Sequence, residues 1–144
     1  MRNTNMGKLY AIVGRPGTGK SAYLNKMKAA SGNSIYLFKS SDYADHHDLL
    51  EKMTSLAQND TLKIIGVDDY EYKLMEMWGG TVDNPQYMAN LQKLSAFAKS
   101  HNTDLYIAVG LNRNADLNNS GSISSQHLRT KAIVTETDGI LFLK

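Results

Sequence analysis

Five short apolar runs recur along the chain, and each ends at a glycine or a polar residue. Short runs that are apolar without strict alternation are typical of strands buried on both faces of a sheet. The predicted strands cover residues 8–14, 34–39, 62–67, 105–109 and 140–143. A sheet built from such strands needs a covering layer on each side.

The segments between the apolar runs carry a different pattern, with apolar residues three and four positions apart. This spacing predicts amphipathic helices over residues 21–30, 45–58 and 85–100. The third helix is the clearest, because Pro85 suits the first turn of a helix.

The alternation of strands and helices predicts an α/β fold in which helices cover both faces of a mostly parallel sheet, as a three-layer α/β/α sandwich. At 144 residues the chain has the length of one domain, which we expect to span residues 1–144. We expect residues 1–7 to be flexible and residues 110–131 to form a mobile loop. Sheets of this kind bind ligands at the carboxyl ends of their strands, so the residues after each strand are candidates for a site.

The first predicted strand leads into the pattern G-x-x-x-x-G-K-S, and a predicted helix follows it. This is the pattern of a phosphate-binding loop, in the context that such a loop requires. Its glycines let backbone N–H groups point at phosphate oxygens, and the helix N-terminus adds its positive dipole end. Lys20 would reach the β- and γ-phosphates, and the Ser21 hydroxyl would bind Mg²⁺. The predicted nucleotide-binding residues are Gly14, Arg15, Pro16, Gly17, Thr18, Gly19, Lys20 and Ser21.

Carboxylates follow the second and third predicted strands. Asp68 and Asp69 end the third strand, where phosphate-loop proteins hold a carboxylate near magnesium. Side chains alternate along a strand, so only one of the two points toward the loop, and we favour Asp68 as metal ligand and catalytic residue. Asp42 follows the second strand and fits either a general base or a helix N-cap, and Asp45 also precedes that helix.

The composition excludes several classes of protein. The chain has no cysteine, so a disulfide framework and a thiolate zinc site are excluded. No apolar run approaches the roughly 18 residues of a membrane helix, and the N-terminus lacks the apolar stretch of a signal peptide. We therefore expect a cytoplasmic protein with no membrane partner. The histidines lack metal-ligand spacing, and we expect His46 and His47 to be solvated at the start of a helix.

Four stretches, in order along the chain, resemble the RecA-type ATPase core of DnaB-family replicative helicases. They are GRPGTGKSAY at 14–23, IYLFKSSDY at 35–43, LQKLSAFAKSHNTDLYIAVGLNR at 91–113, and DLNNSGSI at 116–123 with ETDGILFL at 136–143. The last two are the most specific, because they resemble the family's S-Q-L-N-R and D-L-x-x-S-G-x-I segments. The resemblance implies a RecA-like P-loop NTPase that uses ATP and Mg²⁺ and forms homo-oligomers.

The resemblance also implies roles for single residues. Asp42 falls on the family's catalytic glutamate, and Gly110 falls where the family has a phosphate-sensing glutamine. The segment 112–131 corresponds to a loop that contacts single-stranded DNA, with a solvated loop as the alternative. Candidate contacts to phosphate, DNA or a neighbouring subunit are Asn112, Arg113, Arg129 and Lys131. The family's arginine finger and ring-assembly regions have no counterpart in 144 residues, so we expect a minimal, stand-alone relative of a kind that phages encode.

Charge is distributed unevenly behind a net charge of +2. Residues 1–41 hold seven basic and no acidic residues, whereas residues 42–83 hold ten acidic and three basic residues. We interpret the two segments as the halves of a Mg-nucleotide site, because the surplus basic charge is too small to indicate a strong DNA binder. The favoured function is ATP hydrolysis coupled to DNA replication, recombination or packaging. The alternatives are a catalytically weak nucleotide-binding subunit or inhibitor of a helicase or packaging motor and, third, a small-molecule kinase.

Overall fold

The computed structural model describes residues 7–14, 19–59, 61–68, 70, 85–109 and 136–143. These residues form one five-stranded sheet in which all neighbouring strands run parallel, in the order β2-β3-β4-β1-β5. The strands are β1 (Leu9–Val13), β2 (Ile35–Phe38), β3 (Ile64–Val67), β4 (Asp104–Val109) and β5 (Gly139–Phe142). Each strand overlaps an apolar run, so the predicted α/β fold with a parallel sheet is confirmed.

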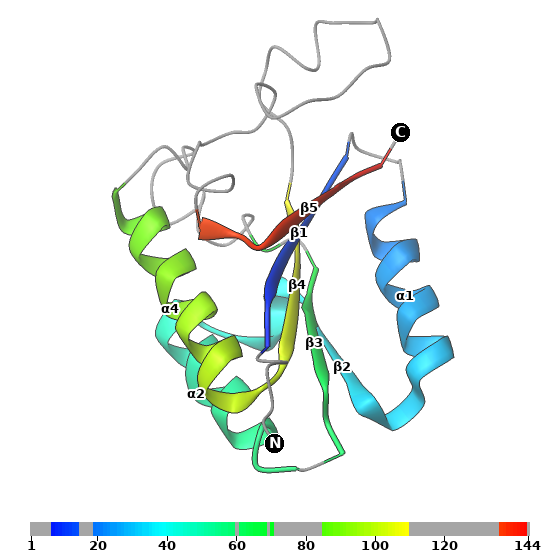
Figure 1. Cartoon of the computed structure of the whole chain (residues 1–144), viewed down its shortest axis with the longest axis horizontal. Helices are drawn as coiled ribbons and strands as arrows, with labels where there is room; N and C mark the ends of the chain where they lie inside the picture. The colour runs from blue at the N-terminus through cyan, green and yellow to red at the C-terminus, as the bar shows by residue number, and fades with distance from the viewer. Residues whose placement is uncertain are drawn as a thin grey trace, which may run out of the picture.

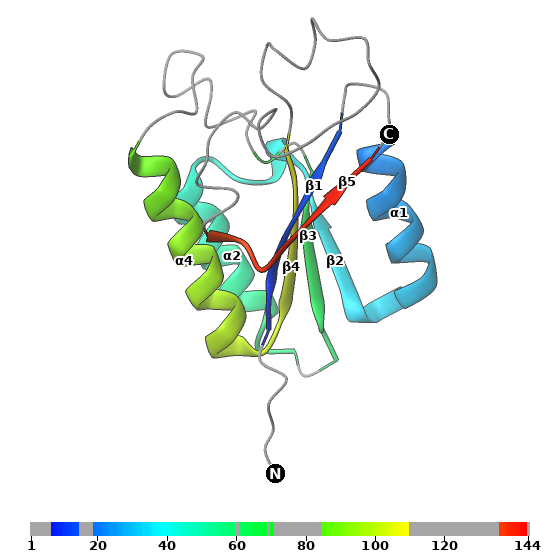
Figure 2. The same cartoon turned by 45° about the horizontal axis from the view of Figure 1, so that its top comes forward.

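Helices cover both faces of the sheet. On one face lies α1 (Lys20–Ser31), and on the other α2 (His46–Leu56) and α4 (Pro85–His101) lie side by side (Figure 1). The view in Figure 2 shows the same division of the helices between the two faces. All three helices fall on segments with the predicted helical spacing. Among the described residues, no helix combines the length and the apolar character needed to cross a membrane.

The two faces of the sheet bury cores of different size. Along β1, Leu9, Ala11 and Val13 belong to the larger core, which also contains buried residues of α2 and α4. Between them, Ile12 belongs to a smaller core with Leu24 of α1. Alternate side chains of a strand point to opposite faces, so the two cores together explain why β1 is apolar at successive positions.

Glycine is required where the described chain begins. Gly7 is buried, and a Cβ atom there would lie 2.2 Å from the carbonyl oxygen of Ala98 and 2.3 Å from that of Thr103. No side chain therefore fits between the start of β1 and the connection from α4 to β4. Residues 1–6 of the segment predicted to be flexible, and the whole predicted loop at 110–131, lie outside the described residues.

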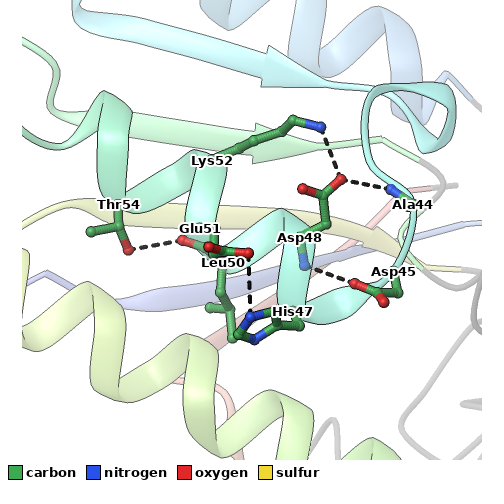
Figure 3. A network of polar contacts seen from close by, with 8 residues as sticks. All are labelled: Ala44, Asp45, His47, Asp48, Leu50, Glu51, Lys52 and Thr54. Atoms are coloured by element: carbon green, nitrogen blue, oxygen red, sulfur yellow. Dashed lines mark hydrogen bonds and ion pairs between the residues drawn. The ribbon is translucent and has the colours of Figure 1, made fainter.

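Polar contacts fix the first turn of α2 (Figure 3). Asp45 is the N-cap, and its carboxylate accepts the backbone N–H of Asp48 at 2.8 Å. The Asp48 carboxylate accepts from the Lys52 ammonium and from the Ala44 N–H, both at 2.8 Å, and these bonds lower the pKa of Asp48. Lys52 also donates to the carbonyl oxygen of Asp42 at 3.0 Å. The helix start is thus attached to the segment that leads into it, with Asp45 as the cap.

Candidate functional site

The parallel sheet brings the residues that follow its strands to one end of the molecule. β1 ends at Val13 and α1 begins at Lys20, so the G-x-x-x-x-G-K-S pattern starts directly after a strand and ends in the first turn of a helix. Gly19 precedes the helix with a φ of 98°, in the left-handed region that favours glycine. Its carbonyl oxygen accepts the N–H of Tyr23 at 2.8 Å, and this bond belongs to the first turn of the helix. The described part of the structure does not include Arg15, Pro16, Gly17 and Thr18.

The side chain of Lys20 reaches back to the end of β1. Its ammonium donates a hydrogen bond of 2.8 Å to the carbonyl oxygen of Gly14, so the two ends of the pattern are joined directly. Gly14 is buried at the end of β1, whereas Lys20 is half-buried. A cation held at the N-terminus of a helix attracts an anion, because the free N–H groups and the helix dipole act in the same direction.

A second contact joins α1 to the end of β3. The Ser21 hydroxyl donates to Oδ2 of Asp68 at 2.5 Å, although β1 and β3 are separated in the sheet by β4. The backbone N–H of Asp68 donates to the carbonyl oxygen of Phe38 at 2.8 Å, which ties this residue to the end of β2. Among the residues that the structure describes, the other carboxylate oxygen of Asp68, Oδ1, is buried without a hydrogen-bond partner. The structure thus brings together the two residues that the sequence suggested as magnesium ligands.

The Oδ1 atom of Asp68 is suited to binding a cation or a water molecule. A buried carboxylate oxygen without a donor loses its hydration with no compensation, and such a group favours a cation or a water molecule beside it. Carboxylate and hydroxyl oxygens are the hard ligands that Mg²⁺ prefers. Among the described residues no three histidine or acidic side chains gather into a metal site. A magnesium ion here would therefore take most of its ligands from water and phosphate, as Mg²⁺ usually does.

Asp42, the candidate base, makes a local contact at the end of β2. It closes the short 3-10 turn η2 (Ser40–Asp42), and its Oδ2 accepts the N–H of Lys39 at 2.7 Å. Its own N–H donates to the Lys39 carbonyl oxygen at 2.9 Å. This is capping geometry, although the cap belongs to η2 and not to α2. The side chain is exposed to solvent.

The same contact covers the side of β2 that pairs with no other described strand, which we call its free side, because β2 is the first strand in the sheet order. Phe38 directs its carbonyl oxygen to β3, so its neighbours Leu37 and Lys39 direct their backbone groups away from β3. Asp42 accepts the outward N–H of Lys39, and the ammonium of Lys28 donates to the outward carbonyl of Ile35 at 2.9 Å. Charged side chains therefore bind outward backbone groups at the start and just after the end of β2.

The sequence did not predict a buried hydrogen bond between His46 and Tyr70, which lies two positions after Asp68. The expectation that His46 is solvated is wrong, because this side chain is only 8% exposed, and its Nε2 forms a 2.8 Å hydrogen bond with the hydroxyl of Tyr70. Burial first, and then the charge of Lys93, lower the pKa of His46 from 6.5 to about 4, against an opposing effect of Asp45. A signal was present, because His46 precedes the buried Leu49 by three positions on one face of the helix.

A groove of about 380 Å³ is lined by residues of β2 and α2. Its lining residues are Tyr36, Phe38, Asp48, Glu51, Lys52, Ser55 and Leu56. None of these is a candidate site residue, and Asp48 and Lys52 already bind each other. The groove therefore adds nothing to the candidate site.

Several predicted contacts lie outside the described residues, namely Asn112, Arg113, Arg129 and Lys131. What the described residues assemble is an ammonium, a hydroxyl and a carboxylate, supplied by Lys20, Ser21 and Asp68. This set can attract a phosphate and share a divalent cation with it. No model of a known protein family matches the sequence, and a search of the curated proteins finds no relative.

Proposed function

We propose that this chain binds Mg-ATP in a phosphate loop and is a P-loop NTPase related to the RecA-type core of DnaB-like helicases. The observation that carries the proposal is the hydrogen bond from the Ser21 hydroxyl to Asp68, with the second carboxylate oxygen of Asp68 buried and without a partner among the described residues. A hydroxyl from the loop and a carboxylate from another strand, side by side, are the groups that share a magnesium ion in phosphoryl-transfer sites.

The charges of the described residues support a nucleotide in preference to an isolated metal. Ser21 and Asp68 supply too few oxygens to enclose Mg²⁺, which completes its octahedron with water and phosphate. The ammonium of Lys20 supplies the positive charge that a polyphosphate needs. On binding, we expect Lys20 to leave the Gly14 carbonyl oxygen and to contact phosphate oxygens.

Calorimetry with ATP in the presence of Mg²⁺ tests the proposal. The substitution Lys20→Ala should abolish detectable binding, because it removes the cation that the phosphates meet. Lys26→Ala is a matched control, since it removes an exposed lysine from the same helix and should leave the affinity unchanged. Equal affinity of the Lys20 variant and the wild type would overturn the proposal.

A second candidate function is nucleotide binding with little hydrolysis, as a subunit or inhibitor of a helicase or packaging motor. It is favoured by the position of Asp42, whose carboxylate is occupied with the N–H of Lys39. That bond turns the carboxylate toward the backbone of η2, where it acts as a cap.

Single-turnover hydrolysis, with and without added single-stranded DNA, separates the two functions. An ATPase that uses Asp42 as its base should lose turnover in Asp42→Ala while retaining affinity for ATP. A binding subunit should retain ATP without hydrolysing it in either form. Turnover that persists in Asp42→Ala would show that another group activates the water.

A further inference from the structure

Tyr70, close to Asp68 in the sequence, takes part in a buried contact with His46. Tyr70 lies two residues after Asp68 along the chain, is fully buried, and bonds through its hydroxyl to Nε2 of His46 at 2.8 Å. We propose that Tyr70 and His46 are positioning residues that hold the Asp68 carboxylate in place and thereby set how strongly Mg²⁺ enhances nucleotide binding. This inference rests on the proposed function, because it concerns the same carboxylate.

Tyr70 connects the end of β3 to both helices on one face of the sheet. Its hydroxyl meets His46 on α2, and its ring stands edge-on to that of Tyr87 on α4, with centroids 6.0 Å apart and planes at 87°. The His46 ring also stands edge-on to Tyr70, at 5.8 Å and 75°. Aromatic pairs prefer this geometry, so the tyrosine ring has a defined position and orientation.

His46 is itself held firmly. It is the first residue of α2, directly after the N-cap Asp45, and its side chain is only 8% exposed. The capping contacts of Asp45 and Asp48 and the bond of Lys52 to Asp48 fix the turn in which it lies (Figure 3). Lys52 also donates to the carbonyl oxygen of Asp42. The anchor for Tyr70 is thus a rigid helix start and not a mobile surface side chain.

Asp68 is therefore fixed on both sides along the chain. Its N–H bonds to the Phe38 carbonyl oxygen before it, and the burial of Tyr70 fixes the chain after it. Groups that hydrogen-bond a metal ligand directly contribute about 10- to 100-fold to metal affinity, and for Tyr70, which acts through the chain, we expect the lower end of that range. Loosening Tyr70 should weaken the magnesium contribution while leaving the contacts of Lys20 to phosphate unchanged.

The test is the ratio of ATP affinity with Mg²⁺ to ATP affinity in excess EDTA, measured by calorimetry. Tyr70→Phe removes one hydroxyl and keeps the ring, and it should lower this ratio by about tenfold with no change in the affinity in EDTA. Tyr36→Phe is the matched control, because Tyr36 is 39% exposed on β2 and should leave the ratio unchanged. His46→Leu should reproduce the effect of Tyr70→Phe, and His46→Gln should restore part of it by supplying a polar partner.

The outcomes separate this inference from the proposed function. If the wild type binds no ATP under either condition, the proposed function fails. If Mg²⁺ enhances binding equally in the wild type and in Tyr70→Phe, the positioning role is overturned and the proposed function stands. A parallel loss of affinity with and without Mg²⁺ would assign Tyr70 a purely structural role and also overturn the inference. Should Tyr70→Phe fail to fold, the comparison of His46→Leu with His46→Gln decides.

Discussion

Acidification from about pH 7 to about pH 4 should destabilise this protein through one buried side chain, His46. Burial lowers the pKa of His46 from 6.5 to about 4, with a further lowering by Lys93 of α4 and a partial opposition by Asp45. The folded protein therefore holds a neutral imidazole against the Tyr70 hydroxyl. The unfolded chain has no such burial, and its imidazole takes up a proton near the ordinary pKa.

The direction of the effect follows from proton binding. Between about pH 6.5 and pH 4 the unfolded state binds a proton at His46 that the folded state does not, so stability falls as the pH falls. The stabilising contribution is complete above 6.5 and is lost as the pH approaches the folded pKa of about 4. At about 1.4 kcal/mol for each pKa unit, the shift is worth about 3 kcal/mol, a large share of the stability of a small domain.

Urea unfolding at several pH values in this window measures the effect. The wild type should lose about 3 kcal/mol of unfolding free energy that His46→Gln, which cannot be protonated, does not lose. His47→Gln is the control, because His47 is exposed beside Glu51 on the same helix turn and should behave as the wild type does. If the wild type and His46→Gln lost stability equally over this window, the argument from burial would be refuted.

Further predictions concern the helix cap, the carboxylate and the partner. Asp45→Ala should lower the unfolding free energy by about 1 kcal/mol, as loss of an N-cap does, and a shift of the thermal midpoint would report it. Asp68→Asn should reduce ATP affinity in Mg²⁺ by at least about tenfold and leave it unchanged in EDTA, and an equal affinity in Mg²⁺ would contradict the assigned ligand. Binding of single-stranded DNA, measured by fluorescence anisotropy, should weaken steeply with salt, and binding insensitive to salt would count against phosphate contacts.

The sequence predicts the strands well because each buried strand consists of consecutive apolar residues. In a parallel sheet with helices on both faces, residues such as Ala11, Ile12 and Val13 all become buried, and an unbroken apolar run results. The pairing of Ser21 with Asp68 is also foreseeable, because strand ends meet at one side of the sheet whatever the strand order.

Contacts that depend on the path of the chain are not foreseeable in this way. Tyr70 meets His46 across 24 positions, from the end of one strand to the start of an earlier helix, and no local pattern records that meeting. Spacing leaves Asp42 as base or cap, because the choice depends on which way the carboxylate turns at the end of β2. The place of β4 between β1 and β3 likewise arises from the whole topology.

The two charged side chains along β2 also bear on how the protein behaves at high concentration. An outer strand with open backbone groups can template a strand from another molecule and begin an intermolecular β-assembly. With Lys28 on the Ile35 carbonyl and Asp42 on the Lys39 N–H, Leu37 is the one position between two bonded outward groups in the described part of β2. One residue is too short a template to nucleate a fibril, so this side of the sheet is a poor starting point for intermolecular β-assembly.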